Sequence, residues 1–194
     1  MQPLTNLTNK QIILASGSPR RRELLGSIHP NFEVRVTDVV ENFPANLFAE
    51  EVPIFLARLK ASAILPSLSP NDIAITADTV VVVNNTILNK PADADEARSM
   101  LRKLSGTTHR VITACSIFSN EKQIECSDTV QVAFRELLSS EIDYYIEHFK
   151  PFDKAGAYGI QEWIGMVGIE RIEGSYYTVM GLPVHKIYNA LIQF

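Results

Sequence analysis

This sequence has few cysteines, no long apolar run and no excess of positive charge, and each absence excludes a class of protein. The two cysteines, Cys115 and Cys126, are too few for a zinc cage or a disulfide framework, so we expect reduced thiols in the core. No apolar stretch has the length that a membrane span requires. The net charge of −4 argues against a partner that is nucleic acid or an anionic membrane.

Signatures of targeting and of several common active sites are missing too. The first six residues lack the basic region and the apolar run of a signal peptide, so a cytoplasmic location is expected. The chain contains no P-loop, no GxGxxG fingerprint and no serine-hydrolase elbow. Its histidines show no ligand spacing and are expected to be structural; they are His29, His109, His148 and His185.

What the sequence does contain is an alternation of strand-like and helical segments. The β-branched run 73–83 predicts a central strand, and the polar residues 119–122 predict a hairpin loop between two long strands. This order predicts an α/β protein with a mixed sheet, in one domain over residues 1–194 that is large enough for two lobes. Strands are expected at 11–16, 32–36, 73–83, 86–88, 108–118 and 123–134, and helices at 19–27, 49–65, 94–104, from Ser139 or Ser140 to 149, and from about Pro183 to the C-terminus.

Three consecutive arginines, residues 20–22, occupy the first turn of the predicted helix 19–27. Ser18 is a suitable N-cap and Pro19 a suitable first helical residue. The helix dipole is positive at this end, so each cation there costs about 0.3–1 kcal/mol. A conflict of this kind is typical of functional sites. Together with free backbone N–H groups, the segment predicts a site for a multiply charged anion, most readily phosphate. Its side chains are those of Ser16, Ser18, Arg20 and Arg21, with Gly17 between the two serines.

Asp78 lies inside the apolar run 73–83, where an ionised carboxylate is costly unless it gains a cation or hydrogen bonds. One interpretation is structural, with Asp78 bonded to backbone or to a buried lysine. The other is a general base or a metal ligand in a cleft, and the predicted phosphate site favours it. Lys90, just before the helix 94–104, is either a solvated loop lysine or a group that covers a phosphate or neutralises Asp78.

Weaker signals come from two carboxylates and a glycine-rich stretch. Asp38 and Glu41 form either a pair that meets a divalent cation or a solvated turn, and Lys60 on the helix 49–65 carries no signal by itself. The stretch 154–161 is either an irregular connection or a ligand-binding loop, because glycines permit close backbone approach to a ligand. Gln161 can donate and accept hydrogen bonds, as recognition of a base edge requires.

Together these segments resemble the Maf family of nucleoside triphosphate pyrophosphatases. The matching stretches cover nearly the whole chain in the expected order. Asn89 departs from the pattern, because glycine is more usual before the Lys-Pro pair. The stretches are LASGSPRR at 14–21, ADTVV at 77–81, KP at 90–91, DKAGAYGIQ at 153–161 and GSYYTVMGLP at 174–183.

The resemblance implies an ITPase-like fold: a long twisted mixed sheet flanked by helices, two lobes with a central cleft, and often a homodimer. It implies hydrolysis of a nucleoside triphosphate between the α and β phosphates with Mg²⁺ or Mn²⁺. Asp78 matches the proton acceptor, and Arg20, Thr79 and Gln161 match positions that sort subfamilies by base, here the dTTP- and UTP-preferring branch. Positions implicated in binding phosphate or metal are Ser16, Ser18, Arg20, Arg21, Lys60, Lys90 and Glu41, with Asp78 as the second metal ligand.

Two functions follow from the resemblance. One is an enzyme that removes unwanted or modified pyrimidine nucleotides from the nucleotide pool. The other is a nucleotide-sensing regulator, since members of the family have been linked to cell division and septum formation. Asp78 distinguishes them, because a sensor needs no carboxylate beside the phosphorus. Whether Lys154 contacts substrate or shapes its loop is left open by the sequence.

Overall fold

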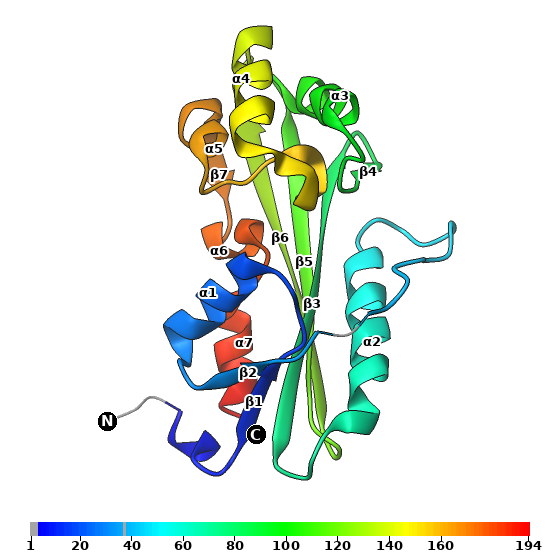
Figure 1. Ribbon diagram of the computed structural model, residues 1–194, viewed down its shortest axis with the longest axis vertical. Helices are drawn as coiled ribbons and strands as arrows, with labels where there is room; N and C mark the ends of the chain where they lie inside the picture. The colour runs from blue at the N-terminus through cyan, green and yellow to red at the C-terminus, as the bar shows by residue number, and fades with distance from the viewer. Residues whose placement is uncertain (1–3, 37) are drawn as a thin grey trace. The chain divides into compact units, whose positions relative to one another are not determined.

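The computed structural model describes residues 4–36 and 38–194, and its chain forms two compact units (Figure 1). The first consists of Met1–Asp78, Thr113–Asp128 and Gly181–Phe194, and the second of Thr79–Ile112 and Thr129–Met180. The two units confirm the two expected lobes. That both lobes belong to one domain over residues 1–194 stays a prediction. Residues 1–3 of the segment inspected for a signal peptide lie outside the described residues.

Within the described residues, seven strands form one mixed sheet in the order β2-β1-β3-β5-β6-β7, with β4 paired to β3. β1 pairs in parallel with β2 and β3, whereas β4 pairs antiparallel with β3, and β7 with β6. The expected mixed sheet flanked by helices is confirmed. The strands are β1 (Gln11–Leu14), β2 (Phe32–Val34), β3 (Asp72–Val83), β4 (Thr86–Leu88), β5 (Thr108–Phe118), β6 (Gln123–Phe134) and β7 (Ile169–Glu173).

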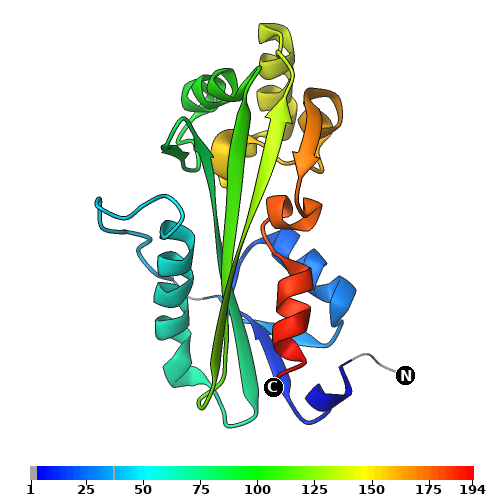
Figure 2. The same cartoon turned by 180° about the vertical axis from the view of Figure 1, so that it is seen from behind.

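In the first unit, helices cover both faces of the sheet. α2 (Val52–Ile64) lies on one face, and α1 (Pro19–Ile28) and α7 (Val184–Leu191) lie on the other, as Figures 1 and 2 show from opposite sides. α2 packs against the strands through Ala61 and Ile64. A strand covered on both faces is buried at successive positions, and β3 is buried without a break from its first residue, Asp72, to Asp78. Two 3₁₀ turns complete the unit, η1 (Thr5–Leu7) and η2 (Leu65–Ser67).

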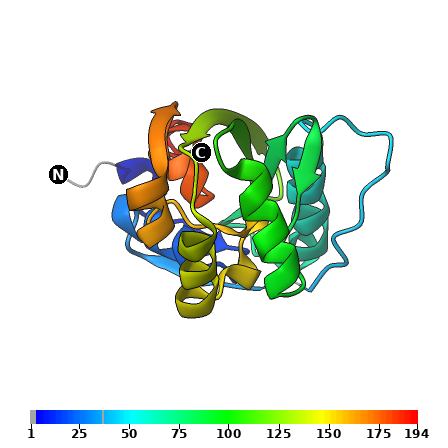
Figure 3. The ribbon, with the colours of Figure 1, turned by 90° about the horizontal axis from the view of Figure 1, so that it is seen from above.

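In the second unit, α3 (Ala94–Leu104) and α4 (Ser139–Phe149) lie side by side (Figure 3). Asp93 caps α3, and its Oδ1 accepts a hydrogen bond of 2.8 Å from the backbone N–H of Glu96. No helix in the described part of the chain is long and apolar enough to cross a bilayer. The shorter elements are η3 (Pro151–Asp153), η4 (Ala155–Ala157), α5 (Trp163–Gly168) and α6 (Tyr176–Met180).

The predicted elements recur, with differences mainly at their ends. The strands 108–118 and 123–134 and the helix 94–104 have the predicted bounds. The helix expected at 49–65 begins at Val52, with Pro53 in its first turn, where a missing N–H costs nothing. Cys115 is a buried free thiol as predicted, but Cys126 is only half-buried, because β6 is partly exposed there. The elements α5, β7 and α6 fall in the glycine-rich stretch 152–182, for which the sequence predicted no helix or strand.

Candidate active site

The turn between β1 and α1 carries the two serines of the predicted anion site. Ser18 is the N-cap, and its Oγ accepts a weak hydrogen bond of 3.5 Å from the backbone N–H of Arg21. The Oγ of Ser16 accepts one of 3.3 Å from the backbone N–H of Ser18. A hydroxyl has one donor and two acceptor sites, so each serine can still donate its proton to an anion. The predicted cap and the proline at the first helical position are both confirmed.

The Arg21 guanidinium donates hydrogen bonds to two backbone carbonyl groups and to one serine hydroxyl. Its Nε donates to the carbonyl oxygen of Gly181 at 2.9 Å, and its Nη1 donates to the carbonyl oxygen of Ala77 at 2.8 Å and to Ser16 Oγ at 3.3 Å. Burial lowers the pKa of the guanidinium, and the nearby charge of Asp78 opposes that shift. Arg21 thus ties the start of α1 to the backbone before Asp78 and to the loop before α7.

A buried lysine joins two carboxylates in the first unit. The Nζ of Lys60, on α2, lies 2.6 Å from Asp78 Oδ1 and 2.9 Å from Glu41 Oε1. Lys60 is 9% exposed and Asp78 8% exposed. The structural interpretation of Asp78, a bond to a buried lysine, is therefore confirmed as a contact.

Among the described residues, Asp78 forms its ion pair with Lys60. The interpretation in which Lys90 neutralises Asp78 stays a prediction; the Lys90 side chain is exposed and belongs to the second unit. A signal for Lys60 existed in the sequence, because it lies on the apolar stripe of its helix between Leu56 and Ile64, both buried. A lysine in that position needs a buried partner.

Glu41 and Asp78 converge on one point, because an oxygen of each lies within 3 Å of the same ammonium group. Carboxylate oxygens suit Mg²⁺ or Mn²⁺, which keep water ligands and take phosphate oxygens from a substrate. Asp38 is exposed, and the described residues contain no group of three or more His, Cys, Asp or Glu side chains that could hold a metal. Glu41 and Asp78 therefore offer carboxylate oxygens of the kind that such an ion binds, and the divalent metal stays a prediction.

Lys154 shapes its own loop in the second unit. Its Nζ lies 3.1 Å from Glu162 Oε1 and 2.7 Å from Asp153 Oδ1, and the residue is 7% exposed. The other Glu162 oxygen accepts a hydrogen bond from the hydroxyl of Tyr145, and Tyr145 Oη accepts one of 3.0 Å from the N–H of Gly159. Burial, reinforced by the Glu162 carboxylate, raises the pKa of Tyr145, so the hydroxyl keeps its proton. We call Tyr145, Lys154 and Glu162 the Glu162 network.

The glycines of this loop approach protein atoms closely. A Cβ added to Gly156 would lie 2.9 Å from Val81 Cγ1, and Gly156 has a φ of +70°. A Cβ added to Gly159 would lie 2.9 Å from Glu162 Cδ. Packing against Val81 on β3 therefore accounts for glycine at position 156, and the close approach of a ligand to this loop stays a prediction.

The residues predicted to recognise the base lie in different parts of the structure. Gln161 directly precedes Glu162 in the chain, and its Oε1 is buried with no hydrogen-bond partner among the described residues. Thr79 follows Asp78 on β3 and is half-buried, and Arg20 is half-buried in the first turn of α1. The first unit thus contains Ser16, Ser18, Arg20, Arg21, Glu41, Lys60 and Asp78, and the second contains Thr79, Lys90 and Gln161.

Comparison with known proteins matches this chain to one family over almost its full length. The family model described as Maf-like protein matches residues 11–194. A dTTP/UTP pyrophosphatase of Cytophaga hutchinsonii is 49% identical over 97% of this chain and 86% of its own length, and one of Porphyromonas gingivalis strain W83 is 49% identical over 98% of each. Among solved structures, the Staphylococcus aureus Ham1 protein is similar in fold, with a TM-score of 0.53, 16% identity, and coverage of 94% of this chain and 98% of that one.

Proposed function

Because this chain belongs to the Maf family, we propose that it is a nucleoside triphosphate pyrophosphatase that converts dTTP and UTP to the monophosphate and pyrophosphate. Whole-chain similarity to two proteins named dTTP/UTP pyrophosphatase supports the substrate assignment. The observation that carries the chemistry is the buried acid Asp78, which meets Lys60 and lies next to the backbone that Arg21 holds. Such an enzyme would remove unwanted or modified pyrimidine nucleotides before polymerases use them.

The start of α1 would bind the triphosphate. Backbone N–H groups of the first turn, the hydroxyls of Ser16 and Ser18 and the guanidinium of Arg20 offer donors to phosphate oxygens. Arg21 would act mainly by holding this turn against the strand that carries Asp78, because three of its hydrogen bonds go to protein acceptors. Lys90, exposed before α3, stays a proposed phosphate ligand.

Asp78 would position and deprotonate the attacking water. The water oxygen attacks the α-phosphorus, its proton passes to Asp78, and the bond from that phosphorus to the bridging oxygen breaks to release pyrophosphate. Lys60 fixes the Asp78 carboxylate and offers positive charge where charge develops on the phosphate. A divalent ion bound by Glu41 and Asp78 would supply Lewis-acid stabilisation of the phosphate oxygens.

Base selection would rest on Arg20, Thr79 and Gln161, as the resemblance implies. Dependence on Mg²⁺ or Mn²⁺, a homodimer and a cytoplasmic location stay predictions. The free thiols of Cys115 and Cys126 agree with a reducing compartment.

The test is Asp78→Asn, which keeps the size of the side chain and an oxygen for Lys60. We expect pyrophosphate release from dTTP and UTP to stop while nucleotide binding, measured by calorimetry, persists. The matched control is Asp72→Asn, since Asp72 is an equally buried carboxylate on β3 that accepts a hydrogen bond of 2.9 Å from the N–H of Ser69. Turnover that survives Asp78→Asn contradicts the general-base role.

A panel of triphosphates with Mg²⁺ or Mn²⁺ tests the substrate. If purine triphosphates are cleaved best, the assignment of Gln161 to pyrimidine recognition is wrong. If the wild-type protein binds dTTP or UTP and releases no pyrophosphate, the sensing role replaces the enzymatic one.

A further inference from the structure

The two cysteines of the sequence lie on the neighbouring strands β5 and β6, within the first unit. At the hairpin loop that joins these strands, the backbone N–H of Ser119 donates to the carbonyl oxygen of Lys122 at 2.8 Å. Cys115 lies four residues before Ser119 on β5, and Cys126 lies four residues after Lys122 on β6. Hydrogen-bonded pairs recur at every second residue of an antiparallel ladder, so the two cysteines face each other in such a pair.

The far end of the hairpin has the same register. The backbone N–H of Phe134 donates to the carbonyl oxygen of Thr107 at 3.0 Å, and these two residues lie eight positions beyond Cys126 and Cys115. Facing residues of a hydrogen-bonded pair have Cα atoms about 5.5 Å apart. Disulfides join residues whose Cα atoms are about 4.4–6.8 Å apart. The backbone therefore already has the spacing that a disulfide between the two cysteines requires.

The two thiols also contact each other. Cys115 is 0% exposed and donates a hydrogen bond to the sulfur of Cys126, which is half-buried. This bond lowers the pKa of Cys126 against the opposing effect of burial, and the charge of Lys186 acts in the same direction as the bond. Burial raises the pKa of Cys115. Because the thiolate is the reactive form of cysteine, Cys126 is the sulfur that an oxidant meets first.

The cysteine pair lies on the sheet face that α1 and α7 cover (Figure 2), since the charge of Arg21 on α1 acts on Cys115 and that of Lys186 on α7 acts on Cys126. Arg21 ties the start of α1 to the backbone before Asp78. Oxidation of a lone thiol to a sulfinic or sulfonic acid is irreversible and would add a negative charge under these helices. A disulfide adds no charge and is reversible.

We propose that Cys115 and Cys126 form a reversible disulfide when the protein meets a hydroperoxide. The Cys126 thiolate attacks one peroxide oxygen, the O–O bond breaks, and Cys126 becomes a sulfenic acid while the other oxygen leaves as hydroxide or alkoxide. The Cys115 sulfur then attacks the Cys126 sulfur, the S–O bond breaks, and the Cys115 proton leaves with the hydroxyl group as water. The two thiols lose two electrons and the peroxide gains them. This modification does not depend on the proposed function.

The first experiment treats the wild-type protein with hydrogen peroxide, blocks the remaining thiols with iodoacetamide in denaturant, and determines the masses of its peptides. We expect the peptides of Cys115 and Cys126 to be joined, with the loss of two hydrogen atoms and no bound acetamide group. Dithiothreitol added before the blocking step should restore both thiols. A disulfide that links two protein molecules, or cysteines that gain oxygen atoms instead, overturns the proposal.

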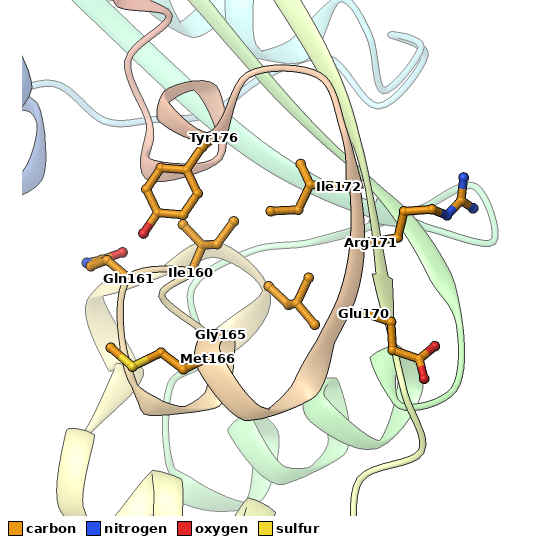
Figure 4. A pocket seen from close by; sticks show the side chains of 9 residues that line it. Ile160, Gln161, Gly165, Met166, Glu170, Arg171, Ile172 and Tyr176 are labelled. Atoms are coloured by element: carbon orange, nitrogen blue, oxygen red, sulfur yellow. The ribbon is translucent and has the colours of Figure 1, made fainter.

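Met166 is the internal control for this experiment. It is 76% exposed and lines a pocket of the second unit, where Figure 4 shows its thioether. Peroxide converts an exposed methionine to the sulfoxide, which adds one oxygen atom to its peptide. Sulfoxide at Met166 together with two unmodified cysteines shows that the peroxide acted and the thiol pair did not, which overturns the proposal.

Cys115→Ser and Cys126→Ser separate the roles of the two sulfurs. In Cys115→Ser, Cys126 has no partner, so peroxide should oxidise it to acids that dithiothreitol does not reduce. In Cys126→Ser, the remaining thiol is buried, and we expect peroxide to consume it at least about tenfold more slowly than the wild-type thiols. Equal rates in Cys126→Ser and the wild type overturn Cys126 as the first sulfur. Full recovery of the thiol in Cys115→Ser overturns the protective role of Cys115. If a variant fails to fold, the wild-type peptide masses decide.

Discussion

Replacing Lys60 by methionine removes the charge that Asp78 meets in the interior. Methionine has a similar length, so packing along α2 changes little. Breaking a buried ion pair by removing one partner costs about 3–5 kcal/mol, because the other charge stays buried without compensation. The bond to Glu41 adds little to this value, since the Glu41 side chain is 43% exposed. We therefore expect Lys60→Met to lower the free energy of unfolding by about 3 kcal/mol, a large part of the roughly 5–15 kcal/mol typical of domains.

Urea denaturation of a double-mutant cycle measures this effect. In the Asp78→Asn background the carboxylate charge is absent, so Lys60→Met should cost much less there than in the wild type. Millimolar Mg²⁺ or Mn²⁺ should restore part of the stability of Lys60→Met, because the ion would neutralise the same two carboxylates and bind only the folded state. The control is Lys103→Met on the exposed face of α3, which should change stability by about 0.5 kcal/mol or less.

Two results would refute this reasoning. A loss below about 1 kcal/mol in Lys60→Met would show that the pair is not effectively buried. An equal loss in both backgrounds would show that Lys60 contributes through packing and not through the charge of Asp78.

Three further predictions concern the second unit. Burial lowers the pKa of His109 to about 4 from 6.5, so the unfolded chain binds more protons between these values. The stability that depends on neutral His109 is therefore complete above about pH 6.5 and lost as the pH falls toward 4, by roughly 2 kcal/mol at pH 5. Urea curves at pH 7 and pH 5 should show this loss in the wild type and not in His109→Gln, and equal losses in both would contradict it. Gly156→Ala should cost about 1–3 kcal/mol because of its positive φ and its close packing, whereas Gly17→Ala, whose added Cβ would meet its nearest side chain at 3.8 Å, should be nearly neutral in thermal melts. Tyr145→Phe should cost about 1–3 kcal/mol and accelerate hydrogen exchange at Gly159, whose N–H loses its acceptor; unchanged exchange there would argue against the network.

Most elements were predictable because their signals are local. The cap of α1 at Ser18, the hairpin loop at 119–122 and the apolar run of β3 each depend on residues that are neighbours in the chain. The elements α5, β7 and α6 were not predictable, since the glycines around them serve packing against distant parts of the chain. One example is Gly174, where an added Cβ would lie 2.9 Å from Val130 Cγ2.

The sequence by itself determined most of the strand and helix order, the Ser18 cap at the start of α1 and the presence of an acid in an apolar strand. Only the tertiary structure decided how these groups are used. Lys60 meets Asp78 from 18 positions away, and Arg21 reaches Gly181 across 160 positions. A buried polar side chain bonds to whichever group the packing of the chain brings within hydrogen-bond distance. That group can be far away in the sequence, so the pattern of apolar and polar residues does not identify it.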